Sequence, residues 1–264
     1  MYNTIIQNID KLKRGTESIT FELTANGANR EFQSAWDALL LDRPDIFWID
    51  TSKIILVTRT TTFIGSVRYK YTLQPQEGST YYMSSFNSEK DVNNAINEIS
   101  DVVSQIVQKC NSGDTYQKVK NAHDAIVSRM EYDQTNSVNN SNIYGAFVEK
   151  KAVCEGYAES FKIIMDKLNI PCVIVYGQGV DGSGNTEAHA WNFVKMDDGV
   201  WYAVDCTWDD PIIIGNGWVS PASRYRYFLK GSNSFSGTHI ANGDVSGTGQ
   251  NFSYPQLSES DYNR

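Results

Sequence analysis

The chain has 264 residues, 41% of them hydrophobic, which is enough for one large domain or two small ones with a packed core. A formal net charge of −8 argues against a nucleic-acid-binding protein, because such proteins usually present a basic face. The sequence contains no run of 18 apolar residues that would span a membrane, and no signal peptide is visible at its N-terminus. The compartment therefore stays open between the cytoplasm and a mature chain whose leader has been removed.

The first 85 residues are predicted to form a strand-rich extension. A helix is expected over 29–41, because apolar residues from Phe32 to Leu39 share one helical face. Runs rich in β-branched and aromatic residues then predict strands over 46–49, 53–60, 63–73 and 81–86, with a turn at 74–79.

Residues 86–264 are predicted to form the core, which begins with two helices. The first covers 88–110 and is amphipathic, and the second is capped by Asp114 and runs to about Met130. The polar loop 136–142 follows, rich in Asn and Ser. It is not interpreted as a domain linker, because the helices on both sides are expected to pack on the same core.

The four cysteines are Cys110, Cys154, Cys172 and Cys206. None of them forms a C-x-x-C pair, which excludes a zinc ribbon and a thioredoxin-like motif. Four cysteines in a chain of this length do not make a disulfide scaffold, although one bridge among Cys110, Cys172 and Cys206 stays open.

A helix is predicted to begin at Cys154 and to end at Asn169, a left-handed cap before Pro171. Its apolar residues recur at helical spacing and form one stripe: Cys154, Tyr157, Ala158, Phe161, Ile164, Met165 and Leu168. Cys154 should therefore face the interior. A thiol in the first turn of a helix is a better nucleophile, because free N–H groups and the helix dipole favour the thiolate. The alternative is a buried structural cysteine, which is the more common case for a lone cysteine on an apolar helix.

After an apolar run at 172–176, residues 177–185 are predicted to form a plain hairpin loop. The polar stretch from Asp181 resembles the start of a calcium loop. The EF-hand pattern fails, because Thr186 stands where Gly is needed and Asn192 where the bidentate Glu is needed.

Two more strands are predicted on either side of the three-residue loop 197–199, whose last residue is a glycine suited to the left-handed conformation. They cover 189–194 and 200–207. This loop length pairs Met196 with Val200. The register then places His189 and Asp205 on one sheet face, as diagonal neighbours about 7–8 Å apart. A different loop length or a bulge would break that register.

Cys154, His189 and Asp205 form a set suited to covalent acyl transfer. The thiolate attacks a carbonyl, the imidazole takes and returns a proton, and the carboxylate orients the imidazole and stabilises its charged form. Histidine is scarce, with three residues in the chain, so a histidine predicted to face an aspartate is informative.

Three motifs resemble the transglutaminase-like superfamily in its bacterial type, whose core is a papain-like cysteine-enzyme fold. They are A-V-C-E-G-Y-A at 152–158, H-A-W-N-F-V at 189–194 and W-Y-A-V-D-C-T-W-D-D-P at 201–211. The resemblance covers roughly 115–240, and 42–48 more loosely resembles a segment that precedes this core in bacterial members.

The resemblance implies an α+β fold, in which a helix carrying the Cys packs on an antiparallel sheet carrying the His and Asp. Residues 1–85 would then be an N-terminal strand-rich α/β extension. It also implies that Cys154 is the nucleophile, His189 the general base and acid, and Asp205 the orienting acid.

Further candidates for the substrate cleft are Tyr157, Trp191, Trp208, His239 and Tyr144. The alternative for the aromatic residues is a place in the core. His239 follows Tyr227-Phe228-Leu229, which resembles the family's closing segment, and its alternative is a surface histidine in a Gly/Ser-rich tail. His123 is interpreted as structural.

The oxyanion hole is not identified from the sequence. The backbone N–H of Cys154 is one natural donor, and a side chain near Asn142 or Tyr144 is a guess at another.

The expected function is thiol-dependent acyl transfer on amide bonds through a Cys154 thioester. Hydrolysis of a peptide or peptide-like substrate, cell-wall peptides included, is preferred, because bacterial members are often classed as proteases. Transfer to an amine is the alternative and differs only in the nucleophile that resolves the thioester. A non-catalytic surface-binding module on the same fold is a further alternative. No cofactor or metal is expected, and the resemblance favours a secreted or cell-surface location over the cytoplasm.

Overall fold

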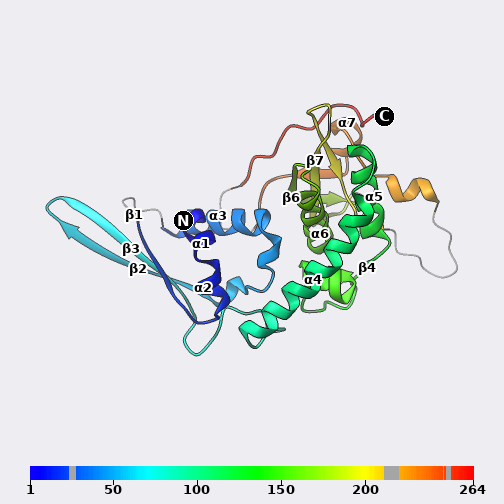
Figure 1. Cartoon of the computed structure of the whole chain (residues 1–264). Helices are drawn as coiled ribbons and strands as arrows, with labels where there is room; N and C mark the ends of the chain where they lie inside the picture. The colour runs from blue at the N-terminus through cyan, green and yellow to red at the C-terminus, as the bar shows by residue number, and fades with distance from the viewer. Residues whose placement is uncertain (24–27, 211–219, 246, 248–250) are drawn as a thin grey trace. The chain divides into compact units, whose positions relative to one another are not determined.

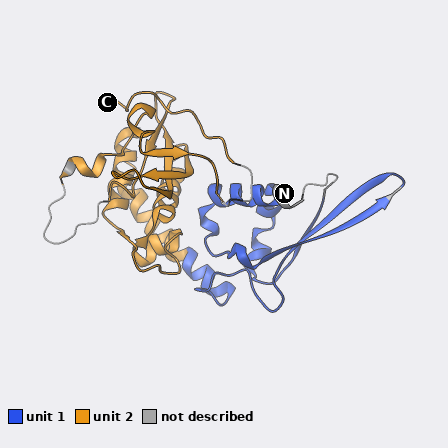
Figure 2. Ribbon diagram, turned by 180° about the vertical axis from the view of Figure 1, so that it is seen from behind, with its two compact units in different colours: residues 1–96, 246–250 blue, residues 97–245, 251–264 orange. Residues whose placement is uncertain are grey.

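The computed structural model describes residues 1–264 except 24–27, 211–219, 246 and 248–250 (Figure 1). The chain divides into two compact units, residues 1–96 with 246–250 and residues 97–245 with 251–264 (Figure 2). The division falls inside helix α4 (Glu89–Cys110). The domain boundary that the sequence places at residue 85 stays a prediction.

The first unit combines short helices with a three-stranded antiparallel sheet in the order β1-β3-β2. Its strands are β1 (Ile19–Leu23), β2 (Ile54–Phe63) and β3 (Ser66–Pro75). Its helices are α1 (Tyr2–Gln7), α2 (Ile9–Lys13), α3 (Ala28–Asp42) and the 3-10 turns η1 (Pro44–Ile46) and η2 (Thr51–Lys53). The helix predicted over 29–41 is therefore confirmed as α3.

The strands predicted over 46–49 and 81–86 are wrong, because those segments share only a single bridge, between Ile49 and Tyr82. Pro44 begins a 3-10 turn that ends at Ile46, and irregular backbone follows. Trp48, Tyr81 and Tyr82 are buried there. These residues are apolar because they are buried in the core. A sequence pattern cannot distinguish such residues from those of a paired strand.

The hairpin between β2 and β3 turns at Ile64 and Gly65, both with positive φ, +41° and +77°. The sequence suggests a break three residues earlier, at 61–62, between the runs 53–60 and 63–73. A β-branched residue rarely adopts positive φ and is typical of strands, so the sequence gives no sign of a turn at Ile64.

The second unit contains a four-stranded antiparallel sheet in the order β8-β7-β6-β9. The strands are β6 (Cys172–Val180), β7 (Thr186–Lys195), β8 (Trp201–Val204) and β9 (His239–Ala241). Helix α6 (Cys154–Lys167) packs against β6 and β7 and also contacts α5 (Thr115–Val127). Smaller elements are β4 (Glu131–Tyr132), the π-helical turn η3 (Gly145–Glu149), β5 (Lys151–Ala152), η4 (Pro221–Tyr225) and α7 (Ser232–Phe235).

The predicted α+β core is confirmed: the helix that begins at Cys154 packs on an antiparallel sheet that carries His189. The apolar stripe of α6 is buried except at half-buried Cys154, and Tyr157, Phe161 and Ile164 are fully buried. The helix ends as expected, since Asn169 adopts the left-handed conformation with φ of +56°.

The predicted β7–β8 register is also confirmed. Met196 N–H donates to the carbonyl of Val200 at 3.0 Å, and Gly199 has a φ of +79°. The ladder pairs Asn192 with Val204 and Lys195 with Trp201, which is the register that the loop length requires.

The second strand is shorter than predicted and ends at Val204, not at residue 207. Asp205 causes this, because its Oδ1 accepts the backbone N–H groups of Thr207 at 2.9 Å and Trp208 at 3.1 Å. A side chain that accepts these N–H groups turns the chain and removes them from the ladder.

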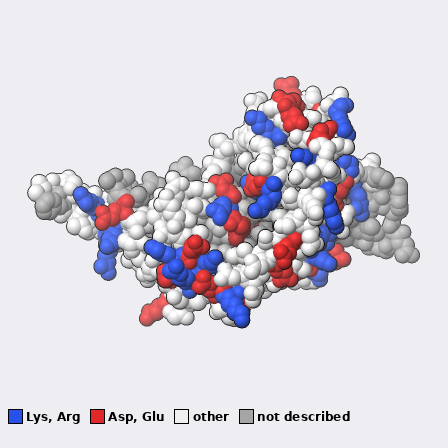
Figure 3. All heavy atoms as spheres, viewed as in Figure 1, with Lys and Arg blue, Asp and Glu red and all other residues white. Residues whose placement is uncertain are grey.

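On the face shown in Figure 3, Lys and Arg side chains of the described residues are interspersed with Asp and Glu. The net charge of −8 is therefore not concentrated on that face. No described helix has both the length and the hydrophobicity needed to cross a membrane.

Asp114 caps α5 as predicted, and its Oδ1 accepts the backbone N–H of Gln117 at 2.9 Å in a reciprocal capping box. We expect Asp114→Ala to lower the free energy of unfolding by about 1 kcal/mol, measured by urea denaturation, because the first-turn N–H groups lose their acceptor. Asp114→Asn keeps an acceptor while removing the same charge, so it should stay near wild type. Equal losses in both variants would contradict the capping role.

Candidate active site

The start of α6 is supported by the polar loop that precedes it. Val153 N–H donates to the carbonyl of Asn140 at 2.8 Å. Gly156 permits this close approach, because a Cβ there would lie 2.9 Å from that same oxygen. Asp133 orders the loop by accepting hydrogen bonds from Thr135, Ser137 and the Asn140 side chain. Cys154 thus begins the helix on a braced backbone and is half-buried.

His189 lies on β7 and is almost fully buried. Its Nε2 is 2.8 Å from Oδ2 of Asp205. A carboxylate can only accept, so Nε2 carries the hydrogen and donates it. The other ring nitrogen, Nδ1, is left for an interaction with Cys154, which contributes to the raised pKa of His189.

Asp205 has no exposed surface and accepts four hydrogen bonds. Its Oδ1 accepts the N–H groups of Thr207 and Trp208, and its Oδ2 accepts Nε2–H groups from His189 and, at 3.0 Å, from His239. Burial alone would raise the pKa of Asp205, but the charge and hydrogen bond of His189 and the hydrogen bond of His239 outweigh it and hold the pKa well below its usual range. The carboxylate is therefore ionised at neutral pH.

Burial alone would lower the pKa of His189, but the charge and hydrogen bond of Asp205 and the hydrogen bond with Cys154 raise it to about 10. The imidazole is therefore charged at neutral pH. Its contribution to folding stability is fully present below the ordinary histidine pKa and is lost as pH rises through about 10. The contribution of Asp205 has the opposite sign: it is present above the ordinary aspartate pKa and is lost as pH falls through the lower folded value.

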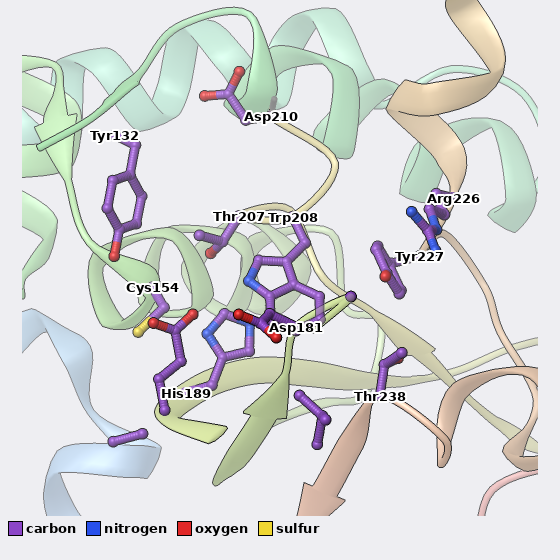
Figure 4. A pocket seen from close by; sticks show the side chains of 14 residues that line it. Tyr132, Cys154, Asp181, His189, Thr207, Trp208, Asp210, Arg226, Tyr227 and Thr238 are labelled. Carbon is purple, nitrogen blue, oxygen red and sulfur yellow. The ribbon is translucent and has the colours of Figure 1, made fainter. Parts of the chain in front are cut away.

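Cys154 and His189 line one pocket of about 550 Å³ (Figure 4). In that view the Tyr132 side chain points from β4 toward Cys154, and the Trp208 indole lies beside His189. Burial raises the pKa of Tyr132, and the charge of Cys154 raises it further, which agrees with the proximity of the two side chains. Besides Cys154 and the charged His189, the ionisable lining among the described residues includes one guanidinium, of Arg226, and three carboxylates, of Asp181, Glu187 and Asp210.

Of the five predicted cleft residues, Trp208 is part of the pocket lining. Tyr157 lies in the core behind it, and its hydroxyl donates to Asp210 at 2.6 Å. Trp191 is buried beside His189, with ring centroids 5.8 Å apart. His239 is buried behind Asp205 and is not a surface residue. Tyr144 is half-buried, outside the described lining.

Asn142, guessed as an oxyanion donor, is not among the described lining residues of the pocket, and its Oδ1 accepts the backbone N–H groups of Tyr144 and Gly145. Tyr132, Thr207 and Arg226 were not anticipated from the sequence. Tyr132 belongs to a two-residue strand, which is too short to leave a periodic signal.

Two glycines of β6 leave room for the aromatic wall. Gly179 lies between the two histidine-bearing strands, paired with Glu187 of β7 on one side and His239 of β9 on the other. A Cβ on Gly179 would lie 2.6 Å from Cζ2 of Trp208. A Cβ on Gly177 would lie 2.1 Å from the carbonyl oxygen of Ile240. The indole of Trp208 can therefore stack on His189, with centroids 4.8 Å apart, only because position 179 has no side chain.

His123 takes a structural role, as expected. It is buried on α5, with Nε2 3.1 Å from Oδ2 of Asp209 and Nδ1 3.2 Å from Oδ1 of Asp124. Asp209 also accepts the backbone N–H of Tyr227 at 2.9 Å. Burial raises the pKa of Asp209 to about 6 despite its hydrogen bond to His123. This pair fastens the segment after β8 to α5.

All four cysteines are free thiols, so the bridge left open among Cys110, Cys172 and Cys206 is not formed. These three are buried, and burial raises the pKa of each. Among the described cysteines, Cys154 alone lines the pocket.

Ligand-type atoms of His189, Asp205 and His239 lie within 4.8 Å of one another, the one such group among the residues that the structure describes. Both imidazoles direct Nε2 at the same carboxylate oxygen at hydrogen-bond distance. That arrangement is a hydrogen-bonded network, in which N–H groups and not nitrogen lone pairs face the centre.

Residues 101–206 match the family model described as the transglutaminase-like superfamily. No curated protein matches the chain. Similar solved structures include a TGase, with 15% identity, 78% of this chain covered, and a TM-score of 0.38. The periplasmic domain of TgpA from Pseudomonas aeruginosa, bound to ethylmercury, has 14% identity over 61% of this chain and 67% of that chain, with a TM-score of 0.32. The chain spans 54% of the TGase chain.

Gly179→Ala should lower the free energy of unfolding by about 1–3 kcal/mol, because the new methyl group overlaps the Trp208 ring. Chemical denaturation measures this. Gly182→Ala is the matched control, since a Cβ at Gly182 of the neighbouring loop meets nothing within 4 Å. An unchanged stability in Gly179→Ala would show that Trp208 is not held over β6.

Proposed function

We propose that this chain, whose residues 101–206 belong to the transglutaminase-like superfamily, is a thiol-dependent enzyme that cleaves amide bonds through a Cys154 thioester. One observation carries the proposal. Cys154 and His189 line the same pocket, and His189 is held by Asp205 at 2.8 Å on the nitrogen that faces away from the thiol.

In the proposed reaction, the Cys154 thiolate attacks the carbonyl carbon of the amide. His189, charged at neutral pH, then gives the proton on Nδ1 to the departing nitrogen as the C–N bond breaks, which leaves a thioester. Neutral His189 next takes a proton from water as the water oxygen attacks the thioester. The C–S bond breaks, the acid is released and the thiolate–imidazolium pair returns.

The tetrahedral intermediate needs donors for its oxyanion. The backbone N–H groups in the first turn of α6 have no helical partners and lie next to the sulfur. The hydroxyl of Tyr132, which points toward Cys154 in Figure 4, is the side chain that we assign as a second donor.

Hydrolysis of a peptide or peptide-like substrate is the preferred reaction, and transfer to an amine is the second candidate. The pocket lining favours amine transfer in one respect. Its three carboxylates outnumber its two cations, Arg226 and the charged His189, and this excess of negative charge would attract an ammonium group. With a glutamine-containing peptide and a primary amine together, hydrolysis yields the free acid alone, whereas transfer yields the substituted amide. Mass spectrometry of the products distinguishes them.

Cys154 should react with iodoacetamide at pH 7 well before the other three cysteines. The reason is that Cys110, Cys172 and Cys206 are buried with raised pKa values, whereas Cys154 lines the pocket beside a charged histidine. Peptide mapping identifies the alkylated residue, and Cys154→Ser is the control that should remove the fast phase. Labelling of all four at one rate, or only after unfolding, would instead favour a non-catalytic binding module.

Asp205→Asn should reduce kcat by about 10³- to 10⁴-fold, because the amide no longer stabilises the charged imidazole or selects its Nε2–H form. The comparison is Asp166→Asn, on the exposed side of α6, which should leave turnover near wild type. Turnover of Asp205→Asn within a few-fold of wild type would remove Asp205 from the mechanism.

A further inference from the structure

We propose that His239 is a positioning residue, which holds the Asp205 carboxylate in the orientation that His189 requires, so that one carboxylate serves two imidazoles. The inference rests on the proposed function and adds a fourth member to the set of Cys154, His189 and Asp205.

The contacts of Asp205 show why one more donor matters. Oδ1 is fixed by two backbone N–H groups of the same turn. Oδ2 receives Nε2–H groups from two strands, His189 of β7 and His239 of β9, which lie on opposite sides of β6. Without His239, Oδ2 would keep a single partner. Three hydrogen bonds would then hold the carboxylate in place of four, and His189 would be the sole partner that sets the direction of Oδ2.

His239 supplies a hydrogen bond without a second charge. Burial lowers its pKa, and the charged His189 nearby lowers it further, against the opposing effect of Asp205. A neutral imidazole that donates from Nε2 must accept at Nδ1, where the hydroxyl of Thr238 lies 2.9 Å away. In this form the hydroxyl gives its single hydrogen to Nδ1 and not to the carbonyl of Phe235, which lies 3.2 Å away. Asp205 therefore balances one cation, on His189, while a neutral group satisfies its remaining lone pair.

The place of His239 excludes contact with substrate. Its ring is stacked on Phe235 with centroids 3.8 Å apart, and Trp208 and Tyr227 pack around it at 4.6 and 5.1 Å. It is 4% exposed and is not part of the described pocket lining. His239 therefore acts on the reaction from outside the pocket, through its hydrogen bond to Asp205 and through its ring contacts with Trp208 and His189.

Few ionisable groups surround this network. Asp205 and Cys154 act on His189, and Asp205 and His189 act on His239. Asp209 and Cys206, on the segment after β8, interact with Asp205 itself. Neither donates a hydrogen bond to Oδ2, so the second donor role falls to His239 alone among the described residues.

The test compares two polar substitutions. His239→Gln can place an amide N–H near the position of Nε2, whereas His239→Asn is too short to reach Oδ2. The rate of Cys154 alkylation by iodoacetamide is measured from pH 5 to 10.5. His239→Asn should lower the rate near neutrality by roughly 10-fold to 100-fold and change its pH profile, because His189 is misplaced. His239→Gln should recover most of the rate. On a substrate, kcat should fall in His239→Asn with KM unchanged.

A wild-type profile and kcat in His239→Asn would overturn the inference, and so would equal losses in both variants. The nitrogen resonances of ¹⁵N-histidine in the wild-type protein give a second criterion, with only three histidines to assign. His239 should be neutral with its proton on Nε2, and a cation or an Nδ1–H form would also overturn it. If wild-type Cys154 reacts like an ordinary thiol, the proposed function fails, and these resonances still decide whether His239 holds Asp205.

Discussion

The burial of one charged carboxylate, that of Asp205, is the constraint on which the second unit depends. An ionised carboxylate removed from water costs several kcal/mol unless hydrogen bonds compensate for the lost solvent. Four donors do so here, from the turn after β8, from β7 and from β9. The hairpin register, the end of β8 and the pairing of β9 with β6 must therefore all be correct at once. Misplacing any of them would leave a buried charge without its partners.

A second buried acid four residues later fastens the same segment from the other side. Asp209 accepts hydrogen bonds from His123 of α5 and from the backbone of Tyr227. The segment from Asp205 to Asp209 is thus tied to the sheet at one end and to α5 at the other. Trp208 lies between the two anchors, which explains why a large aromatic ring can form a defined wall of the pocket.

Two glycines complete this arrangement, because each lets another part of the chain lie directly against its backbone. Gly179 admits the indole over β6, and Gly156 lets the start of α6 meet the loop at Asn140. The first sets the wall beside His189 and the second sets the backbone around Cys154. The positions of Cys154 and His189 therefore depend on these two glycines as well as on the side chains that contact them.

Several local features of this protein can be predicted from its amino-acid sequence. The start of α6 at Cys154, the Asp114 cap and the β7–β8 register follow from helical spacing, capping chemistry and loop length, all of which act within a few residues. Two of the motifs that resemble the superfamily include these features, the start of α6 and strand β7. The irregular segments around Trp48 and Tyr81 were predicted as strands, because burial and strand pairing select the same residue types.

Contacts between residues far apart in the sequence could not be predicted and are seen only in the folded chain. His239 lies 34 residues from Asp205, and nothing in its local pattern separates a surface imidazole from one that donates to a buried carboxylate. Tyr132 and Arg226 reach the pocket from elements that leave no periodic signal. The physical reason is that a hydrogen bond to Asp205 depends on the β6–β9 pairing, which is set by the packing of the whole sheet and not by any residue near His239 in the chain.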